Sequence, residues 1–185
     1  MERMQFGVER PKSCRCAGCV AFCRIMPGMI IPSDLERMMP PFQCNRCYRA
    51  MEGTTACDGA CACGGLIQNT DPLKWAERYL RASPGAIVMK DGMMFRIPTL
   101  VPAKLEGGCI YLSEEGACTI NDAAPFGCAF FGHNQPTKNE YLSAEGLKAV
   151  FHNQQLEGSL YWTLWVHLHS RSLTAEGPEV LRFEK

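Results

Sequence analysis

Twelve cysteines in 185 residues, gathered in three clusters, constrain this chain more than any other feature of its sequence. The clusters are Cys14, Cys16, Cys19 and Cys23; Cys44, Cys47, Cys57, Cys61 and Cys63; and Cys109, Cys118 and Cys128. Thiols grouped this closely are typical of proteins that bind metal through cysteine. The fold therefore has to bring sulfur atoms from separate segments together.

Disulfides are the main alternative use of so many cysteines. The N-terminal residues lack an apolar stretch that resembles a signal peptide, so we expect a reducing, cytoplasmic location. A chain of this length can also bury a core without covalent cross-links. Cys14 and Cys16, like Cys61 and Cys63, are separated by one residue, which is a poor spacing for a mutual bridge. We therefore favour metal binding over disulfides or redox-active thiols.

The charge balance excludes two classes of partner. Nineteen basic and nineteen acidic side chains cancel, so no charge excess favours nucleic acid or an anionic membrane. No stretch approaches the apolar length of a membrane span. We expect neither nucleic acid nor membrane as a partner, and the sequence predicts no oligomeric state.

Local patterns predict several elements in the first half of the chain. Residues 1–30 show few periodic apolar positions and are expected to form a loop. Ser33 and Glu36 have the spacing of a capping box, which predicts a helix over 34–39 that stops at Pro40. A second helix is predicted to begin at Asp71 and to end at residues 83–85.

The later patterns predict strands and then helices. Asp91-Gly92 separates residues 86–90 from 93–97, which predicts a hairpin, and Glu115-Gly116 predicts a second hairpin or turn between 109–112 and 117–120. A helical pattern begins near Ser143, and Gly158 weakens its middle, which leaves open one long helix or two consecutive helices. We expect one small α+β domain over residues 1–185, with a cysteine-rich insertion at about 40–68 that has no regular element over 44–65.

The second cluster has enough thiols for a metal site of its own. Cys44 and Cys47 form a Cys-x-x-Cys pair that places two sulfurs on one tight turn. Cys57, Cys61 and Cys63 follow closely and can complete a tetrahedral set. The glycine-rich insertion has little to bury, so metal binding is expected to organise it.

The first and third clusters are expected to meet in space. Cys23 and Cys109 lie 86 positions apart, and the entropy cost of closing that loop grows only logarithmically with its length. Binding of a structural metal supplies on the order of 10 kcal/mol, which exceeds that cost. Seven thiols are available for this shared site, and spacing does not decide which of them bind.

Four motifs follow one another along the chain: Cys16-Ala-Gly-Cys19-Val-Ala-Phe22-Cys23, Pro27-Gly28, Cys109-x8-Cys118 and Pro125-x-x-Cys128. In this order they resemble the YkgJ-type zinc- or iron-chelating domain. That family is marked by an N-terminal Cys-x-x-Cys-x-x-Cys-Cys, and the resemblance implies a metal centre, with iron-sulfur the favoured form. Phe22 stands where the family has the first cysteine of its adjacent pair, and Cys14 is a candidate substitute. The second cluster is an addition to the family pattern.

All-sulfur ligation is favoured because His133, His152, His167 and His169 lie outside the cysteine clusters. Zinc and a 4Fe-4S cluster both accept four thiolates. Twelve thiols divide into three sets of four, which favours iron-sulfur and more than one centre, with zinc as the alternative. His133 is the histidine retained as a possible ligand or donor.

We expect an electron-transfer protein or an accessory to a partner enzyme, with a protein as the redox or enzyme partner. A zinc-stabilised interaction module is the alternative. A cluster-dependent enzyme is a further alternative, because some larger proteins with YkgJ-type cysteine patterns are protein methylases. The sequence favours no enzyme, since it contains no phosphate-binding loop, dinucleotide fingerprint or hydrolytic triad.

Overall fold

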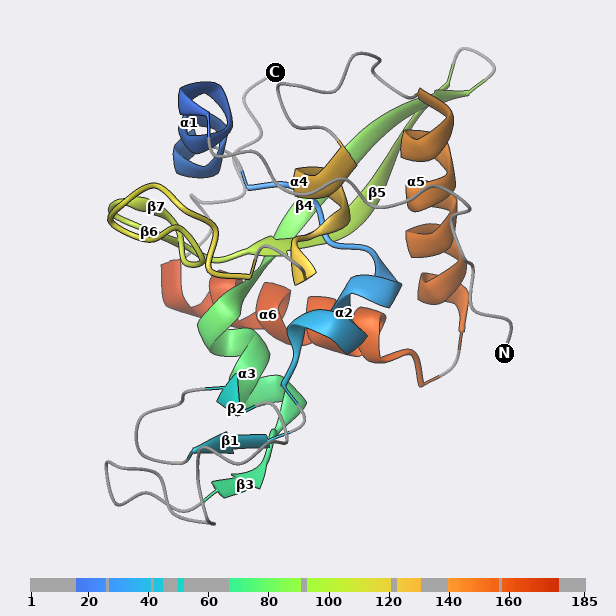
Figure 1. The fold of residues 1–185 in the computed structure, drawn as a ribbon. Coiled ribbons are helices and arrows are strands. Elements are labelled where there is room, and N and C mark those ends of the chain that lie inside the picture. Colours follow the sequence, from blue (N-terminus) through green and yellow to red (C-terminus); the bar gives the residue numbers. More distant parts are fainter. Residues whose placement is uncertain are drawn as a thin grey trace.

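The protein is a mixed α+β structure, as the sequence predicts (Figure 1). The computed structural model describes residues 16–25, 27–40, 42–44, 50–51, 67–90, 93–120, 123–130, 140–156 and 158–176. Its helices are α1 (Ala17–Ile25), α2 (Pro32–Met38), α3 (Pro72–Tyr79), α4 (Phe126–Phe130), α5 (Glu140–Gln155) and α6 (Leu160–Glu176). Its strands are β1 (Phe42–Cys44), β2 (Ala50–Met51), β3 (Ile67–Asn69), β4 (Leu80–Lys90), β5 (Met93–Pro102), β6 (Lys104–Leu105) and β7 (Gly108–Cys109).

The antiparallel β4–β5 hairpin is the longest extended element. Lys90 pairs with Met93, so the hairpin register is the one that Asp91-Gly92 predicts, although both strands are longer than expected. The register shifts between Ser83 and Ala86, where Pro84, which lacks an N–H donor, fits a bulge. The predicted end of the preceding helix is therefore wrong: residues 83–85 belong to β4, and α3 ends at Tyr79.

An aspartate near the start of α2 and another at the start of α3 each accept hydrogen bonds from backbone N–H groups. Asp71 caps α3 as predicted and accepts from Leu73 N at 3.0 Å. The capping box predicted at Ser33 and Glu36 is wrong, since α2 already begins at Pro32. Asp34 instead accepts from the backbone N–H of Ile31 at 2.9 Å.

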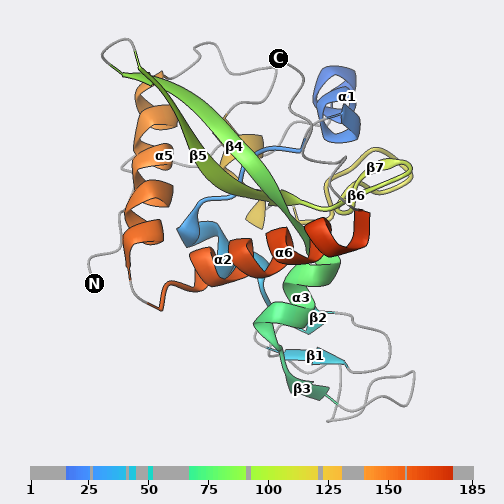
Figure 2. The same cartoon turned by 180° about the vertical axis from the view of Figure 1, so that it is seen from behind.

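The core lies between the hairpin and the helices that cover it. Figure 2 shows α6 crossing the end of the β4–β5 hairpin near α3, while α5 runs alongside the hairpin. Tyr161 of α6 is buried, and its hydroxyl joins two segments by donating to Ile30 O at 2.7 Å and accepting from Leu100 N at 2.8 Å. The same two segments are also joined by a backbone hydrogen bond from Ile30 N to Leu100 O at 2.8 Å.

Two sequence-based expectations about irregular segments are wrong. Residues 17–25 form α1, although residues 1–30 are predicted to be a loop. Cys44 and residues 50–51 lie in strands, although 44–65 is predicted to lack regular elements; β1 pairs antiparallel with β2 and with β3. Of the two alternatives for the C-terminal helical pattern, the structure has two helices, α5 and α6, and Gly158 between them has a φ of 70°. The short β2-β1-β3 sheet lies beyond α3 (Figure 1).

None of the helices among the described residues is long and apolar enough to cross a membrane.

Candidate metal centre

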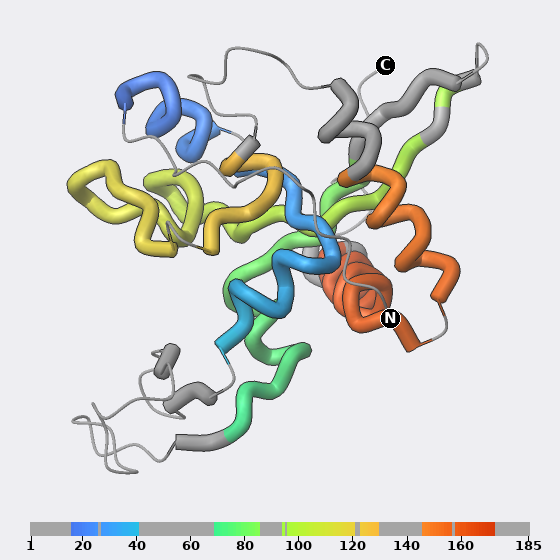
Figure 3. Tube along the Cα trace, turned by 45° about the vertical axis from the view of Figure 1, so that its right-hand side comes forward, coloured from blue at the N-terminus to red at the C-terminus, as the bar shows by residue number. Residues whose placement is uncertain are grey.

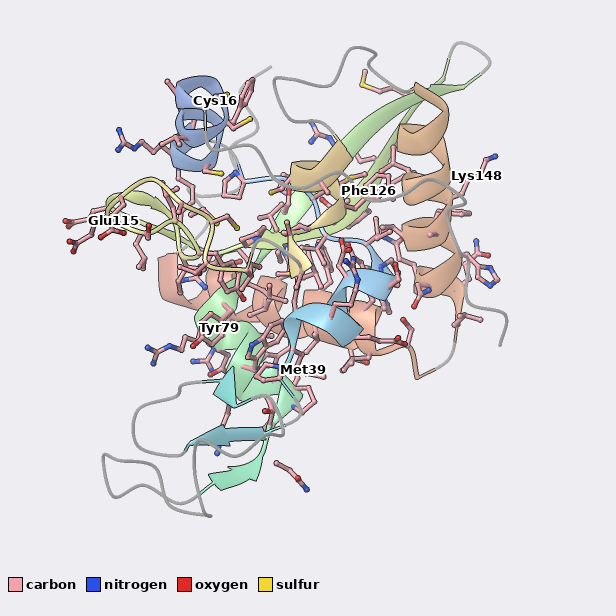
Figure 4. All side chains as sticks on the ribbon, in the orientation of Figure 1. Cys16, Met39, Tyr79, Glu115, Phe126 and Lys148 are labelled. Atoms are coloured by element: carbon pink, nitrogen blue, oxygen red, sulfur yellow. The ribbon has the colours of Figure 1, made fainter. Side chains whose placement is uncertain are left out.

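Helix α1 carries the described cysteines of the first cluster along one of its faces. Cys16, Cys19 and Cys23 recur at intervals of three and four, which places them on one side of a helical turn. The backbone carbonyl of Cys16 accepts from Val20 N at 3.0 Å, so the helical pattern already includes Cys16. Figure 4 shows Cys16 on α1 on the same side of the molecule as Glu115, which lies in the loop between Cys109 and Cys118.

The end of α1 packs directly against β7, and this contact places Cys23 near Cys109. A Cβ atom added to Gly108 would lie 2.7 Å from Arg24 Cα and 3.1 Å from Cys23 O, so only glycine allows this approach. Gly108 also has a φ of 123°, which L side chains rarely adopt. Figure 3 shows α1 in blue beside the yellow segment that follows β7.

A tight turn brings Cys118 back toward Cys109. The predicted Glu115-Gly116 turn is confirmed, with Gly116 at a φ of 76° and its N–H donating to Ser113 O at 3.0 Å. Leu112 and Cys118 form an isolated antiparallel bridge rather than a longer hairpin. Two thiols nine residues apart are thus held at the base of one loop.

Cys128 is held in place by a close backbone contact between the Pro27-Gly28 segment and α4. The N–H of Gly28 donates to Cys128 Sγ at 3.3 Å, and Gly127 N donates to Met29 O at 2.8 Å. A Cβ atom on Gly28 would lie 2.3 Å from Cys128 N, which no side chain can tolerate. The sequence shows the Pro-Gly turn but does not show that Gly28 holds Cys128.

Electrostatics identify four thiols as neighbours: Cys23, Cys109, Cys118 and Cys128, called the buried thiol cluster below. Burial, opposed by a backbone hydrogen bond from Tyr111 and aided by the thiols of Cys23 and Cys118, raises the pKa of Cys109 to about 11. Burial, opposed by the Gly28 hydrogen bond and aided by the other three thiols, raises the pKa of Cys128 to about 12. Burial also raises the pKa of Cys23, with Cys118 as the second cause, and burial raises that of Cys118. At neutral pH the metal-free cluster is therefore protonated.

The expected meeting of the first and third clusters is confirmed for these four thiols. The sulfurs do not form a closed coordination shell: within the part of the chain that the structure describes, no three His, Cys, Asp or Glu side chains are arranged to surround an ion. Cys16 and Cys19 are partly buried; Cys16 directly precedes α1 and Cys19 lies in its first turn. Phe22, which directly precedes Cys23, is 55% exposed.

The remaining predicted ligands are not placed in a site. Six of them lie outside the described residues: Cys14, Cys47, Cys57, Cys61, Cys63 and His133. Cys44 is the last residue of β1. His167 Nε2 lies 2.8 Å from Glu77 Oε1, and the His169 ring stacks on Trp165, so neither of these histidines belongs to the cluster.

Tyr111 is a neighbour of the cluster that the sequence alone does not identify. It follows Cys109 by two residues and is buried, with a ring that stacks on Tyr79 at a centroid distance of 5.7 Å. Burial raises the pKa of Tyr111, and Tyr79, Cys109 and Cys118 raise it further. Its hydroxyl therefore lies within electrostatic range of two of the four thiols and stays protonated at neutral pH.

Comparison of the chain with models of protein families, with curated proteins and with solved structures finds no match.

Replacing Gly28 by alanine is expected to disturb the cluster, because the new methyl group collides with backbone atoms that cannot rotate away. We expect a loss of about 1–3 kcal/mol in the free energy of unfolding, together with weaker metal binding as Cys128 moves. Gly107→Ala is the matched control, since nothing lies within 4 Å of the Cβ position of Gly107. Denaturant unfolding and metal titration of both variants make the test; equal stability of both would contradict the close contact.

Proposed function

We propose that this protein binds metal through the buried thiol cluster, as an iron-sulfur protein that transfers electrons or assists a partner enzyme. The observation that carries the proposal is the convergence of Cys23, Cys109, Cys118 and Cys128 from α1, β7, the following loop and α4. The Cys128 sulfur accepts a hydrogen bond from a backbone N–H one hundred positions away in the sequence. A fold that needed these residues only as small apolar side chains would not require such contacts.

The chemistry of the four donors fits a thiolate-bound metal. Four sulfurs can complete a tetrahedral zinc site or hold the four irons of a 4Fe-4S cluster. The raised pKa values mean that the thiols compete with protons for the metal, so binding releases protons and weakens as the pH falls. Because the sulfurs are neighbours without a closed shell, binding is expected to draw them together and to order the contacts around them.

Two features favour iron-sulfur over zinc. His167 and His169 have other partners, Glu77 and Trp165, which fits the all-cysteine ligation of iron-sulfur clusters. The N–H bond from Gly28 to Cys128 Sγ is of the kind that tunes the reduction potential of such clusters. The YkgJ-type resemblance of the motifs supports a zinc or iron centre in the same residues, so a zinc-stabilised interaction module is the second candidate.

The second cysteine cluster supports an additional metal centre in the insertion. Cys44 lies at the end of β1, and β1 joins β2 and β3 across the stretch that carries the other four thiols. An iron-sulfur protein with two centres would exchange electrons with a protein partner, and a reducing compartment such as the cytoplasm would keep its free thiols reduced.

Anaerobic purification followed by a visible spectrum and by iron, sulfide and zinc analysis tests the proposal. We expect a brown protein with iron matched by acid-labile sulfide, and bleaching by dithionite if the cluster carries electrons. A colourless protein that contains only zinc would replace the leading function by the zinc module. A protein that retains neither metal after reconstitution under reducing conditions would refute both.

A further inference from the structure

Tyr111 has a buried hydroxyl that finds no hydrogen-bond partner. The residue is 8% exposed. Among the described residues, its hydroxyl is one of two buried side-chain polar atoms without a hydrogen-bond partner. Leaving a buried polar group unpaired costs about 1–3 kcal/mol. Native proteins keep few such groups, and each is a candidate for a role in binding a ligand or an ion.

The position of this hydroxyl is fixed by contacts on both the main chain and the ring. Thr119 donates to the Tyr111 carbonyl from its N–H at 2.8 Å and from its hydroxyl at 3.1 Å, which holds Tyr111 beside Cys118. The ring lies parallel to Tyr79 of α3 within 10°, so it is packed in place. Tyr111 is thus a rigid polar side chain on the loop whose two ends carry Cys109 and Cys118.

We propose that the Tyr111 hydroxyl donates a hydrogen bond to a sulfur of the occupied metal centre and thereby stabilises it. The inference rests on the proposed function, because it requires metal at the buried thiol cluster. A protonated thiol is a weak acceptor, whereas a metal-bound thiolate or cluster sulfide carries negative charge and accepts strongly. The unpaired donor therefore weakens the metal-free state and gains its partner only when metal binds.

This role makes Tyr111 a positioning residue with opposite effects on two states of the protein. In the metal-free state, removal of an unpaired hydroxyl at constant ring size removes an unfavourable burial. In the metal-bound state, the same change removes a bond to the ligand sulfur, and such partners of metal ligands are worth about 10- to 100-fold in affinity. In an iron-sulfur centre, loss of a hydrogen bond to sulfur also shifts the reduction potential.

Tyr111→Phe in the full chain tests the inference, with zinc(II) and with iron and sulfide as separate probes. We expect metal-free stability equal to or above that of the wild type, zinc affinity lower by about tenfold or more in a chelator competition, and a more negative potential of the reconstituted cluster. Tyr161→Phe is the control: its hydroxyl is already paired twice, so the variant should lose stability and keep the wild-type zinc affinity.

The outcomes separate the inference from the function on which it depends. Wild-type metal affinity and potential in Tyr111→Phe would overturn the role of the hydroxyl and leave metal binding intact. Equal losses of affinity in Tyr111→Phe and Tyr161→Phe would also overturn it, because both would then act through general destabilisation. Failure of the wild type to bind either probe would overturn the proposed function, and the inference with it.

Discussion

Replacing Cys118 by serine is expected to remove metal from the centre formed by the buried thiol cluster. Partners that merely support a metal ligand are worth about 10- to 100-fold in affinity, so loss of one of four ligands should cost at least about 100-fold. The pKa of Cys109 and that of Cys128 should also fall in the metal-free variant, because Cys118 contributes to raising both. Metal content per chain and a thiol titration against pH measure the two effects.

Cys16→Ser and Cys47→Ser are the comparison variants for Cys118→Ser. Cys16 lies on the same face of α1 as Cys23, so the metal content after its replacement shows whether the first cluster supplies a second ligand to this centre. Cys47 belongs to the second cluster, and its replacement should remove a different fraction of the metal if the insertion holds its own centre. Equal and complete loss from Cys118→Ser and Cys47→Ser in folded protein would argue for one shared site.

Replacing Asp34 by alanine is expected to cause a large loss of stability. Its side chain is fully buried, and one oxygen accepts from Ile31 N at 2.9 Å and from Phe126 N at 2.7 Å. The other oxygen pairs with Arg37. The alanine variant leaves two buried N–H groups without an acceptor, each of which costs about 1–3 kcal/mol, whereas the partly exposed Arg37 can turn to solvent. Denaturant midpoints of the metal-free protein at constant pH measure the loss.

Glu36→Ala is the matched control on the same helix. The sequence pattern assigns the capping role to Ser33 and Glu36, whereas the structure leaves Glu36 exposed and gives the buried acceptor role to Asp34. We expect a change within about 0.5 kcal/mol for Glu36→Ala. A loss in Glu36→Ala as large as that in Asp34→Ala would restore the capping box and contradict the structure. Because Phe126 starts α4, which carries Cys128, Asp34→Ala should also weaken metal binding.

Local signals in the sequence are sufficient where the physical cause is local. The Asp71 cap acts on N–H groups two and three residues away, and the Asp91-Gly92 pair sets the register of the strands on either side of it. The α+β class follows from the same short-range patterns.

Local sequence patterns do not predict the elements that depend on packing between distant segments. The first cysteine cluster has too few periodic apolar positions to predict a helix, yet α1 forms where its end packs against Gly108 of β7. The predicted continuation of α3 to residues 83–85 is overridden because the residues that follow Tyr79, from Leu80 to Ser83, pair with β5 in the sheet. In both segments, contacts with residues distant in the sequence outweigh intrinsic helix propensity.

By itself, the sequence determined the donor chemistry of this protein: twelve thiols in three clusters, with two of the clusters expected to meet. Only the tertiary structure decided that Cys23, Cys109, Cys118 and Cys128 are the neighbours, that Gly28 holds Cys128, and that the Tyr111 hydroxyl is buried without a partner. The physical reason is distance along the chain. Spacing limits which sulfurs share a turn, but sulfurs about one hundred positions apart meet only where the backbones of glycine-containing segments pack within contact distance.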